Sequence, residues 1–357
     1  MPGIMAPAWR DVDVPMSTAL CETIESRVAF LSTPAAWPDH PTSVQVIETH
    51  FAYVFLTGAH AWKLKKPLAF GAIDYRTLES RERGCRSELH LNRRLAPGIY
   101  LDVVPLCRNA CGTLQLGGDG RPVDWLVQMR ELSAARMLDR ALRAGEIPAA
   151  EIAAVTRHLC RFFQRAEPAP LDGPQYLERL ARESRQELAE LAAPEAGAPC
   201  AQLAELATLH RGCLDTFGEV LAARIAAGRV VDGHGDLRPE HVWLGPPVAV
   251  IDCLEFDADP RRLDSAEEIA FLTLECERAG AATLARKLTD AYRAYCHDAI
   301  APPLFDFYRS RRALVRGRLA AWRLREPGCR DPTRWRDTMR AYLGLAVDAA
   351  RRALEIR

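Results

Sequence analysis

The sequence VDGHGDLRPEHVWLGPPVAVIDCLEF, residues 231–256, combines a polar turn with a short apolar hairpin. His234 and Asp236 lie on a turn punctuated by glycines, where polar side chains crowd a bend of the backbone. Two apolar runs separated by Gly-Pro-Pro then predict a buried β-hairpin, and Asp252 ends the second run. A carboxylate after four apolar residues is costly to bury unless a cation or hydrogen bonds meet it. The hairpin therefore predicts that the two aspartates face each other across a metal-sized gap, as in phosphoryl transfer.

The pattern His-Gly-Asp-Leu-x-Pro, followed by an apolar strand, a turn and Ile-Asp, resembles the catalytic and metal loops of the aminoglycoside phosphotransferase and choline kinase family. The resemblance implies a protein-kinase-like fold, with Asp236 as the catalytic base and Asp252 as a metal ligand. That family normally has asparagine as the second metal ligand, five residues after the base. Here this position is His241, which we take as the candidate second ligand.

Two neighbours of Asp236 have alternative interpretations. His234 is either a buried histidine that satisfies the turn or a ligand, and the turn role is favoured. Arg238 either neutralises charge that develops on a transferred group or is an exposed loop arginine, and the sequence favours neither.

The lysines are concentrated in one place. Of the 47 basic residues only four are lysines, and three of them, Lys63, Lys65 and Lys66, fall within one strand-like run. A lysine ammonium docks on phosphate as a compact point charge, unlike the planar guanidinium of arginine. The cluster therefore indicates contact with phosphate.

Three strand-like runs predict a small antiparallel sheet: residues 44–47, 53–57 and 61–68. Because side chains alternate along a strand, Lys63 and Lys65 share one face. The pattern Ala61-x-Lys63 resembles the strand that presents the phosphate lysine in kinases, so we favour Lys63 over Lys65. The resemblance also implies that Glu88, in a helix expected over residues 76–95, is the ion-pair partner of that lysine. The turn at residues 48–52 contains no glycine, which departs from the glycine-rich loop of kinases.

Strands give way to helices at Met129-Arg130-Glu131-Leu132, after two further strands expected over residues 101–106 and 123–129. We interpret this segment as a hinge, with Met129 and Glu131 beside the nucleotide's adenine. The fold class expected is α+β: a two-lobed kinase-like fold with a small antiparallel-sheet lobe and a larger, mostly helical lobe. The expected division is an extension at 1–40, the sheet lobe at 41–129 and the helical lobe at 130–357. Helices are expected over residues 133–144, 149–167, 175–191 and 201–227, and another begins at Asp264.

Composition excludes several classes. Lysine plus arginine and aspartate plus glutamate balance at 47 each, so charge gives no reason to expect nucleic acid or a membrane surface as partner. The N-terminal residues lack a signal-peptide pattern and no run of 18 apolar residues occurs, which favours the cytoplasm. The eleven cysteines are scattered singly and are expected to be reduced packing residues.

Residues 308–325 contain seven arginines, with Arg312 and Arg316 on one helix face. A solvated basic face is expected there, and a clamp for an anionic substrate is the alternative.

These observations predict a transferase that moves the γ-phosphoryl group of ATP to a hydroxyl of a small molecule, with Mg²⁺ or Mn²⁺. Two alternatives remain: an inactive kinase-like protein that binds nucleotide or a partner, and a hydrolase in which His234, Asp236, His241 and Asp252 bind one metal ion. The resemblance is to a branch sometimes fused to a C-terminal P-loop ATPase domain. The chain contains no Gly-x-x-x-x-Gly-Lys-[Ser/Thr] sequence.

Overall fold

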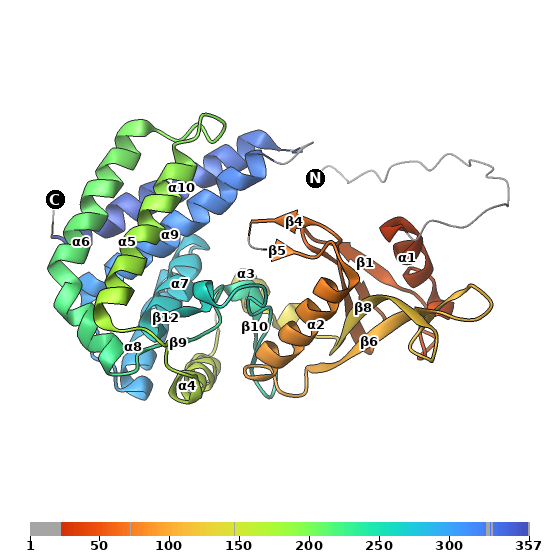
Figure 1. Ribbon diagram of the computed structural model, residues 1–357. Coiled ribbons are helices and arrows are strands. Elements are labelled where there is room, and N and C mark those ends of the chain that lie inside the picture. Colours follow the sequence, from red (N-terminus) through yellow and green to blue (C-terminus); the bar gives the residue numbers. More distant parts are fainter. Residues whose placement is uncertain (1–22, 72, 146, 326–328, 330, 356–357) are drawn as a thin grey trace.

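A six-stranded antiparallel sheet forms one lobe of the molecule. The structure, a computed structural model, describes residues 23–71, 73–145, 147–325, 329 and 331–355. The strand order is β1-β2-β3-β8-β6-β7. The strands are β1 (Gln45–Glu48), β2 (Ala52–Leu56), β3 (His60–Lys65), β6 (Tyr100–Arg108), β7 (Leu114–Leu116) and β8 (Arg121–Arg130). The sequence predicted five of these runs, and the third ends earlier than expected. After it the chain forms a small hairpin, β4 (Ala69–Phe70) and β5 (Ile73–Asp74), at the side of the sheet toward the helices (Figure 1).

Helices cover both faces of this sheet. On one face, Trp37 packs on Phe55 and Trp62 beneath α1 (Ile24–Leu31), with ring centroids 5.7 and 5.1 Å away. On the other face lies α2 (Leu78–Arg93), whose Cys85 packs on the sheet. Alternation along β3 therefore points Trp62 toward α1 and the two lysines toward α2, as the sequence predicted. The sequence also predicts a helix over about residues 21–31, which α1 confirms, and residues 21 and 22 lie outside the described residues.

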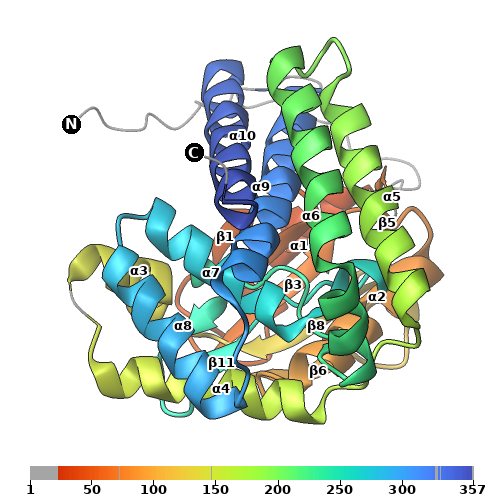
Figure 2. The same ribbon diagram turned by 90° about the vertical axis from the view of Figure 1, so that its left-hand side faces the viewer.

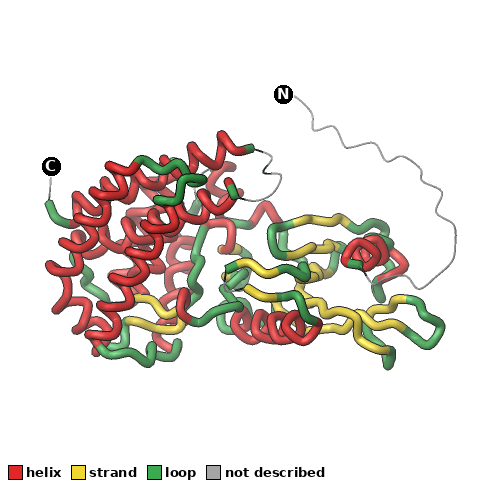
Figure 3. Tube along the Cα trace, turned by 45° about the horizontal axis from the view of Figure 1, so that its top comes forward, coloured by secondary structure: helices red, strands yellow, loops and turns green. Residues whose placement is uncertain are grey.

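The remainder is mostly helical (Figures 1 and 3). Four long helices lie side by side: α5, α6, α9 and α10 (Figure 2). The helices of this part are α3 (Leu138–Ala144), α4 (Ala149–Arg165), α5 (Gly173–Leu191), α6 (Cys200–Ala226), α7 (Ser265–Arg278), α8 (Ala282–Cys296), α9 (Pro302–Leu324) and α10 (Pro332–Ala353). The α+β, kinase-like fold class is thus confirmed, whereas the domain boundaries at 40 and 129 stay a prediction.

Two short antiparallel pairs carry the segment quoted above. β9 (Val230–Asp232) pairs with β12 (Arg262–Asp264), and β10 (Val242–Trp243) pairs with β11 (Ala249–Val250). The predicted hairpin is therefore confirmed. The helix expected over residues 133–144 is interrupted, because Met137 is extended and bridges to Trp243 of β10.

The structure contradicts one expectation about the cysteines. The expectation that the cysteines are all reduced is wrong for Cys160 and Cys296, which form a disulfide. Packing of α4 against α8 brings their Cα atoms to 5.4 Å, although 136 positions separate them in sequence. Among the helices that the structure describes, none is both long and apolar enough to cross a bilayer.

Candidate active site

The turn between β9 and β10 is held by buried groups from two helices. Gly235 has a φ of +87°, a region that favours glycine, and a Cβ there would lie 2.9 Å from a methyl of Leu254. The buried Glu268 of α7 accepts hydrogen bonds from the amides of His234 (2.5 Å) and Gly235 (3.0 Å). Arg312 of α9 donates to the carbonyl of Gly235 at 2.5 Å. The position of Asp236 is therefore set by residues far along the chain.

His234 is the buried turn histidine that the sequence favoured. Its Nε2 donates to the carbonyl of Ile251 (2.8 Å), and its Nδ1 accepts from the amide of Asp236 (3.2 Å). Burial, followed by the neighbouring His241, lowers the pKa of His234 to about 4. Both ring nitrogens are engaged, so His234 ties the turn to Ile251, which follows β11 and precedes Asp252.

The carboxylate of Asp236 is ionised and partly engaged. Although burial would raise its pKa, neighbouring positive charges, above all that of Arg238, lower it to about 2. Arg238 Nε donates to Asp236 Oδ2 at 3.0 Å, and the same guanidinium pairs with Glu240. With a side chain 16% exposed, Arg238 is not the exposed loop arginine that the sequence left open.

Asp252 faces the lysines of β3 from an unusual backbone conformation. Its φ is +64°, a left-handed conformation that aspartate tolerates better than most residues, and its amide donates to Tyr100 Oη at 3.1 Å. Lys63 Nζ lies 2.8 Å from Asp252 Oδ1. The Lys63 ammonium holds the pKa of Asp252 well below its usual range. Half of the Asp252 side chain is exposed, so its second oxygen is open to a ligand.

Glu88 of α2 is shared between the two lysines. Its Oε1 is 2.8 Å from Lys63 Nζ, and its Oε2 is 2.6 Å from Lys65 Nζ. Burial would lower the pKa of Lys63, but the carboxylates of Asp252 and Glu88 raise it well above its ordinary value. Lys63 is the lysine that also contacts Asp252, and its choice over Lys65 for phosphate stays a prediction.

His241 lies between the two aspartates. Its Nδ1 donates to the carbonyl of Asp236 at 2.8 Å, which leaves a lone pair on Nε2. Nε2 is 3.5 Å from Asp252 Oδ2 and 3.3 Å from Arg238 Nη2. A histidine that donates one ring nitrogen to a backbone carbonyl presents the other in the manner of a metal ligand.

Asp252 and His241 together fit a metal ion that binds to the protein together with the phosphates of a nucleotide. Within the described part of the chain, no group of three or more His, Cys, Asp or Glu side chains is arranged to hold a metal. Mg²⁺ in nucleotide sites takes few protein ligands, because phosphate oxygens and water supply the rest. Asp252 with His241 meets that requirement, whereas a four-ligand hydrolase site does not form.

The residues that the sequence analysis interpreted as a hinge lie at and just after the end of β8. Met129 pairs with Ala61 of β3 and with Tyr100 of β6 in the middle of the sheet. The amide of Glu131 donates to the carbonyl of Ala59 (3.1 Å), and its Oε2 accepts from the amide of Gly58 (2.8 Å). Their contact with nucleotide stays a prediction.

Several residues around the site were not identified from the sequence. Glu255 and Tyr100 contact the lysines or Asp252, and Glu268 supports the turn that carries Asp236. Glu255 lies within the quoted stretch, three positions after Asp252, which is the only signal that could have identified it. The expectation of a solvated basic face on α9 is wrong for Arg311 and Arg312, which are buried: Arg311 pairs with Glu183, and Arg312 donates to the carbonyl of Gly235.

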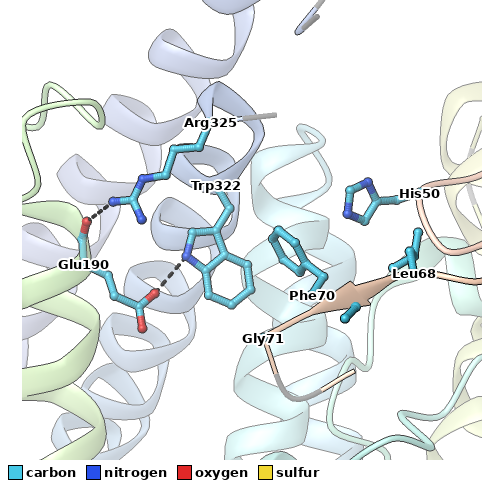
Figure 4. A pocket seen from close by; sticks show the side chains of 8 residues that line it. His50, Leu68, Phe70, Gly71, Glu190, Trp322 and Arg325 are labelled. Atoms are coloured by element: carbon cyan, nitrogen blue, oxygen red, sulfur yellow. Dashed lines mark hydrogen bonds between the residues drawn. The ribbon is translucent and has the colours of Figure 1, made fainter. Parts of the chain in front are cut away.

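The lobes meet again beside the turn that replaces the glycine-rich loop. Arg323 of α9 lies 2.8 Å from Nδ1 of His50, and Phe70 stacks edge-on against Trp322 with centroids 5.0 Å apart. His50, Phe70 and Trp322 line a hollow of about 570 Å³ (Figure 4), where Trp322 Nε1 donates to Glu190 Oε2 (2.8 Å). The tip of the turn is thus fastened to the helical lobe by side chains rather than left free.

Sequence comparison finds relatives that align over most of the chain. No protein-family model matches the chain. A Mycobacterium tuberculosis protein described as uncharacterized is 34% identical over 291 residues, which is 78% of this chain and 56% of that protein. The chain therefore spans about half the length of the curated relatives it matches.

Two solved structures share the architecture over most of the chain. Choline kinase from Cryptosporidium parvum superposes with a TM-score of 0.56 at 10% identity, covering 92% of this chain and 96% of that one. A choline/ethanolamine kinase family protein from Mesorhizobium loti gives 0.51 at 13% identity, covering 92% and 100%. At such identities the likeness shows the kinase-like fold alone. A fusion to a P-loop ATPase domain stays a prediction.

Proposed function

We propose that the chain is an ATP-dependent phosphotransferase that moves the γ-phosphoryl group to a hydroxyl of a small molecule. The observation that carries the proposal is the convergence of Asp236, Asp252 and the Lys63–Glu88 pair, which come from different elements of a kinase-like fold. Phosphoryl transfer requires little covalent chemistry from the protein, and positioning with charge neutralisation supplies most of the catalysis.

Each of these side chains has a distinct role in the proposal. Asp236 is ionised and keeps one oxygen free of Arg238, so it accepts a hydrogen bond from the acceptor hydroxyl and orients it. Arg238 holds the Asp236 carboxylate from the other side. Lys63, oriented by Glu88, binds the nucleotide phosphates.

Asp252 and His241 would hold the Mg²⁺ or Mn²⁺ that accompanies ATP. When bound, that ion neutralises charge on the phosphates. Met129 and Glu131 are proposed to lie beside the adenine. The inactive kinase-like alternative predicts nucleotide binding without turnover, and acceptor-dependent release of ADP from a panel of hydroxylated metabolites distinguishes it.

Nucleotide binding is the first test. A ligand at 100 times its dissociation constant stabilises the native state by about 2.7 kcal/mol, which a melting experiment detects. ATP with Mg²⁺ or Mn²⁺ is expected to raise the melting temperature, and a melting temperature that ignores both mixtures contradicts the proposal.

The second test separates the aspartates. Asp236→Asn is expected to reduce turnover by roughly 10²- to 10⁴-fold, the usual worth of a positioned general base, with nucleotide affinity kept. Asp252→Asn is expected to abolish metal-dependent nucleotide binding. Asparagine tolerates the left-handed backbone conformation of Asp252, so the change tests the charge rather than the fold. Equal losses of binding in both variants would contradict this division of roles.

A further inference from the structure

Lys65 is a buried cation that the proposed chemistry does not use. It lies at the end of β3 with 1% of its surface exposed. Its Nζ lies 2.6 Å from Glu88 Oε2, 2.5 Å from Glu255 Oε1 and 4.9 Å from the centre of the Tyr75 ring. A buried ammonium is costly unless it is fully paired, and here two carboxylates pair it.

Glu255 connects the segment after Asp252 to three other parts of the sheet lobe. Besides Lys65 of β3, its Oε1 accepts a hydrogen bond from Tyr75 Oη at 2.7 Å. Its backbone carbonyl accepts from Ser87 Oγ of α2 at 3.1 Å. The loop that carries Asp252 is therefore bonded to β3, to the residue that follows β5, and to α2.

The surface of α2 is shaped to fit around this cluster. A Cβ on Gly84 would lie 2.6 Å from Tyr75 Cε1 and 3.2 Å from Lys65 Cε. At 2.6 Å the Cβ of any other residue would collide with the Tyr75 ring. Glycine at position 84 therefore allows α2 to approach Lys65. Glu88, one turn further along α2, is thereby brought within reach of both lysines.

We propose that Lys65 and Glu255 form a positioning pair that holds α2 and the Asp252 loop in their working arrangement before nucleotide binds. This inference rests on the proposed function. In the structure Lys63 is bonded to both Glu88 and Asp252. When Asp252 takes the metal and Lys63 takes phosphate, the Lys63–Asp252 bond is lost. Lys65 then remains as the side-chain link from Glu88 to the Asp252 loop, through Glu255.

Electrostatics gives the pair a second effect. Glu88 and Glu255 are both bonded to the Lys65 ammonium, and their like charges would repel each other at this separation without it. The carboxylates of Glu88, Asp252 and Glu255 carry three negative charges, and the two lysines carry two positive charges. The cluster therefore has an excess of one negative charge, which favours binding of a metal cation. Lys65 thus lets three carboxylates gather at the site without driving α2 away from the loop.

The test measures positioning rather than turnover. The affinity of a non-hydrolysable ATP analogue is measured by calorimetry with and without Mn²⁺, in the full chain. In Glu255→Ala the gain in affinity that Mn²⁺ provides is expected to fall about tenfold, the lower end of the cost of losing a residue that supports a metal ligand. In Glu255→Gln the amide oxygen still accepts from Tyr75 and Lys65, so most of the gain is expected to return.

Hydrogen exchange provides the readout without nucleotide. Amides of residues 78–93 in α2 are expected to exchange faster in Glu255→Ala than in the unmodified protein. Lys66→Ala is the matched control, because the next lysine pairs with the exposed Glu48 instead, and it is expected to change neither readout.

The outcomes separate this inference from the proposed function. If the unmodified protein binds no nucleotide, the proposed function fails, whereas the exchange experiment still tests the pair. Full Mn²⁺ enhancement together with unchanged α2 exchange in Glu255→Ala would overturn the inference. If Glu255→Ala does not fold, Lys65→Met and Glu255→Met, each of which removes the ion pair but keeps a side chain of similar length, are compared with their double variant. Strictly additive effects on the Mn²⁺ enhancement would then overturn it, because a pair that acts as one unit is lost once.

Discussion

Replacing His241 by asparagine tests the proposal that His241 is a metal ligand. The histidine donates from Nδ1 to the carbonyl of Asp236 and aims Nε2 at Asp252 Oδ2, 3.5 Å away. An imidazole nitrogen is a softer ligand than an amide oxygen, and Mg²⁺ prefers oxygen, whereas Mn²⁺ and Co²⁺ accept nitrogen more readily. His241→Asn is therefore expected to shift preference from Mn²⁺ toward Mg²⁺.

Two magnitudes follow from the contacts of His241. Loss of the hydrogen bond to Asp236 is expected to lower the free energy of unfolding by about 1 kcal/mol, the net worth of one such bond. A tenfold fall in the ratio of Mn²⁺- to Mg²⁺-supported affinity would correspond to about 1.4 kcal/mol of differential binding. The two effects are of similar size but appear in different measurements, so they do not mask each other.

The assay is titration of a non-hydrolysable ATP analogue in Mg²⁺, Mn²⁺ or Co²⁺, which needs no acceptor. Urea unfolding supplies the stability of each variant. His90→Asn is the matched control, since His90 is exposed on α2, and it is expected to leave the metal ratio unchanged. A ratio of Mn²⁺ to Mg²⁺ affinity that stays constant in His241→Asn would show that His241 only hydrogen-bonds the turn.

Two further predictions concern the lysines and a buried histidine. Lys63→Arg is expected to weaken nucleotide binding by about 1.5–3 kcal/mol, the worth of a charged hydrogen bond, because a planar fork cannot replace a point charge in a fitted site. Lys66→Arg is expected to be nearly silent in the same titration, and the reverse order would move the phosphate contact elsewhere on β3. Burial, followed by Arg311, lowers the pKa of His210 to about 3, so the unfolded chain takes up a proton below about pH 6.5 that the folded chain does not. His210 therefore lowers the free energy of unfolding by about 1.4 kcal/mol for each pH unit of acidification between pH 6 and 4. Urea unfolding of His210→Asn is expected to show a shallower dependence of this free energy on pH than the unmodified protein. Parallel pH dependences in the two proteins would contradict the lowered pKa of His210.

Local sequence determined the parts of the site that depend on neighbouring residues. The glycines around His234 predicted a tight turn, and the two apolar runs before Asp252 predicted the hairpin that the structure contains. Strand alternation placed Lys63 and Lys65 on one face, and both side chains are found toward α2. These features follow from periodicity and backbone preference, which act over a few residues.

Tertiary packing decided which charges meet. Only the family resemblance singled out Glu88, and the periodicity of the sequence does not distinguish Glu88 or Glu255 from other glutamates on charged segments. The direction of each side chain depends on how its segment packs against the sheet. The same holds for Arg312, which reaches Gly235 across 77 positions, and for Cys160 and Cys296. A charged side chain in a short motif is by default solvated, and burial against a distant partner is what gives it a fixed position. The sequence alone therefore determined the two aspartates and the lysine strand, whereas only the packing of α2, α7 and α9 around them decided how each is held.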